Sequence, residues 1–140
     1  MKKNLWKSVW AVLAGVLGII LATTLVDIVL HVAGVYPAGG KLDDRLAFVA
    51  SSYRLIIGIA GGYLTAKLAP DRPLWHALIL GWVGVALGLA GVVATWNMDL
   101  GPRWYPISLA VLAIPQCWLG GRLREKQVET SVAVESTPAS

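Results

Sequence analysis

Two ionisable residues inside long apolar runs are the best candidates for chemistry in this sequence. Arg54 lies near the middle of the apolar stretch 46–68, and Asp27 lies within the preceding apolar stretch. A guanidinium keeps its charge, and an arginine at the centre of a membrane-spanning helix costs about 3 kcal/mol on insertion scales. Arg54 therefore needs a partner, and a bidentate pair with the Asp27 carboxylate would satisfy both charges.

Further polar side chains surround this pair at helical spacing. Thr23, Asp27 and His31 recur every four residues, on one helical face. The depth of Asp27 matches that of Arg54 to within roughly 5 Å at a rise of 1.5 Å per residue. The predicted intramembrane polar cluster, in the outer half of the first two helices, comprises Asp27, Arg54, His31, Thr23, Ser51 and Tyr53. Such a cluster is either a structural ion pair that fixes helix register or a proton- or ion-linked site.

Other catalytic and metal sites are not predicted. Asp27 and His31 provide two metal ligands at most, since His76 and Cys117 are expected at the opposite membrane face. Cys117 is the single cysteine, which excludes an intrachain disulfide. The sequence contains no nucleophile–base arrangement, phosphate-binding loop or dinucleotide fingerprint. We therefore predict a protein without catalytic residues, metal or cofactor, and not an enzyme.

The composition indicates a membrane protein. Hydrophobic residues make up 56% of the 140 residues and charged residues only 14%, against about 25% in soluble domains. The apolar runs predict an all-α membrane protein with four transmembrane helices in an antiparallel bundle, at about 6–33, 46–68, 74–96 and 104–121. The first run is too long for a signal peptide. We assign residues 1–126 to the transmembrane domain and predict a disordered cytoplasmic tail over 127–140.

The basic residues predict the orientation in the membrane. The N-terminal segment, the connection between the second and third helices and the segment after the fourth hold eight: Lys2, Lys3, Lys7, Lys67, Arg72, Arg122, Arg124 and Lys126. The two opposite connections hold Lys41, Arg45 and Arg103. This asymmetry places both termini in the cytoplasm. The net charge of +4 reflects topology, so the predicted partner is the lipid bilayer and not nucleic acid.

Small residues recur at helix-packing intervals, which lets helices approach closely in lipid. The residues predicted to pack are Gly15, Gly18, Gly58, Gly62, Gly81, Gly84, Gly88 and Gly91. Because Arg54 shares a face with Gly58 and Gly62, we expect it to point into a packed interface. These contacts would join helices of one chain, two copies in a homodimer, or this chain and another membrane protein.

Several short motifs along the chain form a recognisable set: Asp27, His31, Gly34-Val35, Pro37, Tyr53-Arg54, Gly61-Gly62-Tyr63, Ala69-Pro70, His76-Ala77, Thr95-Trp96, Gly101-Pro102 and Trp104-Tyr105-Pro106. With these motifs the chain resembles a group of small four-helix bacterial inner-membrane proteins without an assigned activity. The resemblance implies a multi-pass protein of the bacterial cytoplasmic membrane. We expect a structural or accessory role through helix–helix contacts; the alternative is a small proton- or ion-linked transporter using Asp27, His31 and Arg54.

Overall fold

The chain folds into four helices, and the computed structural model describes residues 2–38, 41–99 and 101–136. The helices are α1 (Lys2–Val32), α2 (Asp44–Leu68), α3 (Pro73–Thr95) and α4 (Trp104–Ser136), with no strand in the described residues. Three stretches, Asn4–Val32, Asp44–Leu68 and Pro73–Thr95, are long and apolar enough to cross a membrane. The predicted all-α membrane fold is confirmed at this level.

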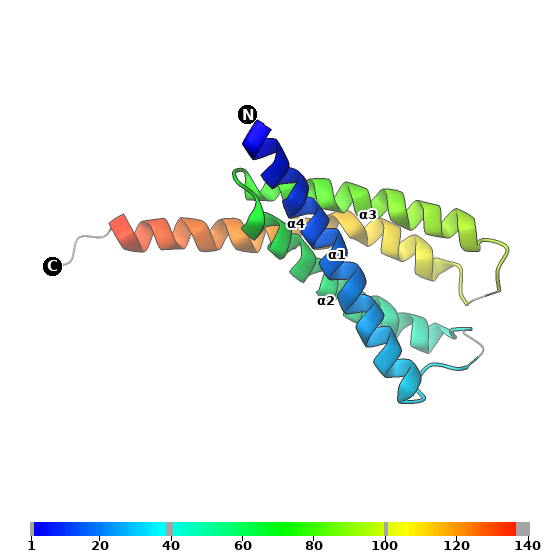
Figure 1. Ribbon diagram of the computed structural model, residues 1–140. Helices are drawn as coiled ribbons and strands as arrows, with labels where there is room; N and C mark the ends of the chain where they lie inside the picture. The colour runs from blue at the N-terminus through cyan, green and yellow to red at the C-terminus, as the bar shows by residue number, and fades with distance from the viewer. Residues whose placement is uncertain (1, 39–40, 100, 137–140) are drawn as a thin grey trace.

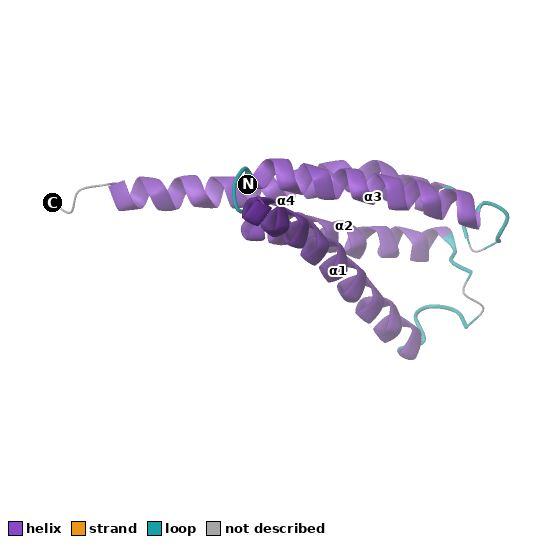
Figure 2. Cartoon of the chain, turned by 45° about the horizontal axis from the view of Figure 1, so that its top comes forward, coloured by secondary structure: helices purple, strands orange, loops and turns teal. Residues whose placement is uncertain are grey.

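The helices do not form an even bundle. α3 and α4 run side by side, and α2 packs along α4 (Figure 1). α1 packs mainly on α2, contacts α3 less extensively and does not pack against α4 in the described part of the chain. Figure 2 shows that α1 diverges from α3 and α4 toward its C-terminal end. The bundle is therefore tight around α4 and open on one side at the end of α1.

Two adjacent glycines let α4 approach two helices at once. A Cβ atom on Gly120 would lie 2.6 Å from the backbone nitrogen of Tyr63 in α2, and one on Gly121 would lie 2.5 Å from the Cβ of Ala77 in α3. The predicted end of the fourth helix at these glycines is wrong. Glycine weakens an isolated helix, but here the contacts with α2 and α3 more than offset this propensity.

α4 also extends through much of the predicted disordered tail. Residues 127–136 are helical, and only 137–140 of the predicted tail lie outside the described residues. No proline interrupts the chain between Pro115 and Ser136. Exposed contacts along the helix join Arg122 to Glu125 at 2.8 Å and Arg124 to Gln127 at 2.9 Å. The polar side chains of this segment therefore lie on the solvent-exposed surface of a helix.

Most of the predicted packing glycines lie at contacts within the chain. Gly58 and Gly62 of α2 face Gln116 and Cys117 of α4. The remaining contacts are between α1 and α2 (Gly15 with Thr65, Gly18 with Leu64) and between α3 and α4 (Gly81 with Ile114, Gly84 with Ala113, Gly88 with Ala110). The exception is Gly91, because a Cβ atom added there would meet nothing within 4 Å. The small-residue contact between α3 and α4 ends before Gly91.

At the N-terminal end, α1 is attached to α3 by a buried histidine. His76 Nε2 lies 2.8 Å from Ser8 Oγ, and His76 Nδ1 lies 3.1 Å from the Arg72 carbonyl oxygen. Further along, Gly15 packs against Leu80. These contacts hold the first half of α1 against α3, whereas the second half leaves it (Figure 1).

Local motifs shape the connections at the other end of the bundle. α1 ends in a Schellman motif: Val35 N–H donates to the Leu30 carbonyl, Gly34 N–H donates to the His31 carbonyl, and Gly34 has φ +78°. The Asp43 side chain caps α2 by accepting from Leu46 N–H at 2.8 Å.

Three contacts join the α1–α2 connection and the start of α2 to the α3–α4 connection and the start of α4. Lys41 pairs with Asp99 at 2.7 Å, and the Trp104 indole N–H donates to Asp44 at 2.9 Å. Gly101, with φ +149°, lies so close to Leu42 that a Cβ atom would be 2.8 Å from the Leu42 carbonyl oxygen. The start of α2 is therefore tied to the start of α4.

Candidate functional site

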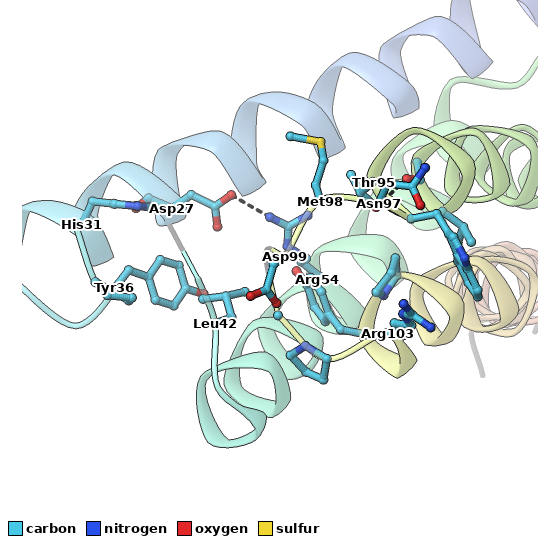
Figure 3. A pocket seen from close by; sticks show the side chains of 18 residues that line it. Asp27, His31, Tyr36, Leu42, Arg54, Thr95, Asn97, Met98, Asp99 and Arg103 are labelled. Atoms are coloured by element: carbon cyan, nitrogen blue, oxygen red, sulfur yellow. Dashed lines mark hydrogen bonds and ion pairs between the residues drawn. The ribbon is translucent and has the colours of Figure 1, made fainter. Parts of the chain in front are cut away.

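The predicted ion pair is present. Arg54 Nη2 lies 2.6 Å from Asp27 Oδ2, and the two side chains point toward one another (Figure 3). Both are about 30% exposed, at 30% for Arg54 and 29% for Asp27. The pair joins α1 to α2 in the half of the bundle where α1 diverges from α3. It is neither fully buried nor free in solvent.

Tyr53 completes the hydrogen bonding of the Asp27 carboxylate, and Tyr36 bonds Tyr53 in turn. The Tyr53 hydroxyl donates to Asp27 Oδ1, the oxygen that Arg54 leaves free. The Tyr36 hydroxyl lies 2.7 Å from that of Tyr53 and is placed there by the Schellman motif that turns the chain back after α1. Both Asp27 oxygens therefore have partners, and the buried Tyr36 belongs to the same network.

The guanidinium of Arg54 also has aromatic neighbours. Its central carbon lies 5.9 Å from the ring centroids of both Tyr53 and Tyr105. Such distances allow a cation–π attraction, which strengthens where water is excluded. Arg54 Nε is buried and has no hydrogen-bond partner among the described residues. The electrostatic environment supplied by Asp27 and the two rings thus replaces part of the lost hydration of Arg54.

His31 lies next to the ion pair and keeps one ring nitrogen available. Its Nδ1 lies 2.9 Å from the Asp27 backbone carbonyl oxygen, which can only accept, so Nδ1 carries the hydrogen. In the neutral ring Nε2 is then an acceptor. The His31 ring meets Tyr36 edge-on, with centroids 5.2 Å apart. His31 therefore borders the network without contacting the Asp27 carboxylate.

Two predicted members do not join this cluster. Thr23 donates its hydroxyl to the Ile19 carbonyl at 2.7 Å, and Ser51 donates to the Ala47 carbonyl at 2.9 Å. Both hydroxyls donate a hydrogen bond to a backbone carbonyl on the preceding turn of their own helix, which is the usual arrangement for such residues within a helix. The structure thus brings together Asp27, Arg54 and Tyr53, with His31 beside them.

The ion pair lines a cavity of about 640 Å³. The predicted placement of Arg54 in a packed interface is therefore wrong: Gly58 and Gly62 of the same face do contact α4, but Arg54 lies beyond that contact. The divergence of α1 leaves space at this level, and Gly91 opens onto it. The helices contribute Asp27 and His31 from α1, Arg54 from α2, Gly91 and Thr95 from α3, and Tyr105 from α4.

The connection between α3 and α4 adds charge and an aromatic surface to the cavity. Asp99 lines it and is paired with Lys41. Arg103 also lines it, with its guanidinium carbon 4.9 Å from the Trp96 ring centroid. Arg103 has no carboxylate partner among the described residues. Within the described ranges, no group of three or more His, Cys, Asp and Glu residues is placed to hold a metal ion.

Sequence reasoning missed several residues of this site: Tyr36, Trp96, Arg103 and Tyr105. The three aromatic rings, and Arg103 as a basic residue beside a helix, are typical of a membrane interface, which hid their second role. One signal was available, since aromatic residues flank the glycine- and proline-containing connection on both sides. Their convergence on one cavity depends on how the helices and their connections pack, which no local pattern contains.

Comparisons with protein-family models, curated proteins and solved structures give no match. The resemblance to small bacterial inner-membrane proteins therefore remains a prediction.

The first testable prediction concerns Tyr53. Tyr53→Phe should lower the free energy of unfolding by about 1 kcal/mol, because Asp27 Oδ1 and the Tyr36 hydroxyl both lose a partner. Thermal unfolding in detergent measures the change. Ser52→Ala is the control, since that exposed hydroxyl bonds only the Phe48 carbonyl of its own helix. An equal effect of both substitutions would mean that the tyrosine network adds nothing.

Proposed function

We propose that this protein is a non-catalytic, multi-pass protein of the bacterial inner membrane that binds a ligand in the cavity at its outer face. The observation that carries the proposal is the position of the Asp27–Arg54 pair. A purely structural ion pair needs only a closed interface, whereas this pair lines a cavity of about 640 Å³. That volume lies within the range of about 300–1,000 Å³ that is typical of small-molecule sites.

In this proposal α4 is the fourth membrane span. Its first half is less apolar than the other helices because it includes Pro115 and Gln116. The Gln116 side chain, however, lies against Gly58 of α2, within the bundle. A polar side chain that faces a neighbouring helix is tolerated in a membrane far better than one that faces lipid. Four spans place both termini on one side, and the distribution of basic residues supports the cytoplasmic side.

The closed inner half favours binding from one side over transport. At Gly62, Gly81 and Gly120 the helices pack so closely that an added Cβ atom would meet backbone atoms of the neighbouring helix. Such close contacts favour a site that opens away from the termini. A receptor-like or accessory protein needs a site open to one side only. In this role the small residues serve internal packing, while a homodimer or a membrane-protein partner would use other surfaces.

A proton- or ion-linked carrier is the second candidate. Asp27, His31 and Arg54 all line the cavity, which is where a carrier would place its coupling residues. A carrier must also expose the site to the cytoplasm, which would require α1 to leave Thr65 and His76. α1 makes the least extensive contacts of the four helices and none with α4 among the described residues, so this movement would spare the contacts around α4.

Cysteine labelling separates these functions. We expect Thr95→Cys to react with a membrane-impermeant thiol reagent in intact cells, because residue 95 lines the cavity. Wild-type protein is the matched control, since its single cysteine, Cys117, is only 2% exposed. Reaction in intact cells but not in inverted vesicles indicates a one-sided binding site. Reaction in both indicates a carrier. Failure to react from the outside would overturn the proposed binding function.

A further inference from the structure

The cavity is closed on one side and open on another. The contacts Lys41–Asp99, Leu42–Gly101 and Asp44–Trp104 tie the start of α2 to the α3–α4 connection and to α4. No such contact ties the end of α1 to α3 in the described residues, and the two helices diverge there (Figures 1 and 2). In a membrane, this opening between α1 and α3 would face the outer leaflet.

The charges around the cavity favour an anion. Both carboxylates in its lining already have cationic partners: Asp27 pairs with Arg54, and Asp99 pairs with Lys41. Arg103 stacks on Trp96 and has no carboxylate partner among the described residues. Counting Lys41, which pairs with Asp99 from outside the lining, three cations stand against two carboxylates, and Arg103 is the one without a carboxylate partner among the described residues. A cationic ligand would have to displace an existing pair, whereas an anion would meet Arg103 directly.

The lining combines this charge with apolar surface. Val92, Met98 and Pro106 line the cavity, together with the face of Trp96. A small hydrophilic anion would leave this surface without a partner. A molecule with a charged head and apolar chains would use the polar and apolar parts together.

We infer that the cavity receives the phosphate-bearing headgroup of an anionic membrane lipid, whose acyl chains leave between α1 and α3. This inference rests on the proposed binding function of the cavity and specifies its ligand. The phosphate interacts with Arg103 and the chains remain in the outer leaflet. A lipid reaches the site sideways, so the contacts that tie α2 to the α3–α4 connection need not open.

Lipid binding to the purified full-length protein tests this inference. In native mass spectrometry we expect phosphatidylglycerol to bind in preference to phosphatidylcholine with the same acyl chains. Arg103→Gln should weaken phosphatidylglycerol binding about fivefold, the effect of about 1 kcal/mol per basic residue near anionic lipid. Arg45→Gln is the matched control, because Arg45 is exposed at the start of α2 and outside the cavity lining. Equal loss in both variants, or no preference between the lipids, would overturn the inference.

Two further experiments distinguish a failure of the lipid assignment from a failure of the proposed binding site. Glycerol phosphate, a headgroup without chains, should compete poorly with phosphatidylglycerol; equal competition would assign the site to a soluble anion. Phosphatidylglycerol should also slow the labelling of Thr95→Cys in nanodiscs. If Thr95→Cys reacts and the lipid has no effect, the lipid assignment fails while the cavity remains a binding site. If Thr95→Cys never reacts, both proposals fail.

Discussion

Asp27→Asn should lower the free energy of unfolding by about 2 kcal/mol. Removing one partner of a buried ion pair costs about 3–5 kcal/mol, and the partial exposure of both side chains, 30% and 29%, reduces that figure. Arg54 cannot shed its charge, so the variant leaves a guanidinium among two tyrosine rings with no carboxylate. The thermal unfolding midpoint in detergent, followed by helical circular dichroism, measures the loss.

A double substitution tests whether the unpaired charge of Arg54 causes this loss, and a second ion pair provides the control. Asp27→Asn combined with Arg54→Gln should recover much of the loss, because no unpaired charge remains. Asp99→Asn is the control: it removes one carboxylate from the exposed Lys41–Asp99 pair, whose side chains are 62% and 82% exposed. That change should cost less than about 1 kcal/mol. A double variant no more stable than Asp27→Asn would show that the two residues do not stabilise each other.

Gly120→Ala should cost about 3 kcal/mol, at the upper end of the usual range for overpacking. The added Cβ atom would lie 2.6 Å from the Tyr63 backbone nitrogen, and backbone cannot move aside as a flexible side chain can. α2 and α4 would have to separate, which removes neighbouring contacts such as that of Gly62 with Cys117. We expect a lower unfolding midpoint and faster labelling of Cys117, which the same interface buries.

Gly91→Ala is the matched control for this prediction. It makes the same chemical change in a helix, but a Cβ atom at position 91 meets nothing within 4 Å. Alanine is a better helix former than glycine, so this variant should be more stable by about 0.5 kcal/mol. If both variants lost stability equally, the close approach of Gly120 to α2 would not explain the effect.

Intramembrane charge was the most informative part of the sequence. Two opposite charges at similar depth on consecutive antiparallel helices have few other charged residues within reach. The sequence alone was therefore enough to pair Asp27 with Arg54. The glycine intervals likewise predicted which faces of α1, α2 and α3 pack. Both inferences rest on the high cost of polar groups in lipid and on the close approach that small residues permit.

The cavity could not be predicted in the same way. Helical periodicity assigns Arg54, Gly58 and Gly62 to one face, but it does not say where along that face the neighbouring helix ends its contact. That limit depends on the divergence of α1 and on the contacts of Gly101 and Trp104 with the start of α2. Gly120 and Gly121 were misinterpreted for a related reason, because a glycine pair in a helix and a glycine pair at its end look alike in sequence.

The length of α4 has a mechanical consequence. Its 33 residues extend about 50 Å at 1.5 Å per residue, whereas the hydrocarbon core of a bilayer is about 30 Å thick. In the proposed topology, with α4 as the fourth span, about 20 Å of continuous helix would project from the membrane. Figure 1 shows the C-terminal part of α4 extending beyond the other helices. A reporter domain fused after Ser136 would stand clear of the lipid headgroups on a semi-rigid rod, with its distance and direction set by the helix.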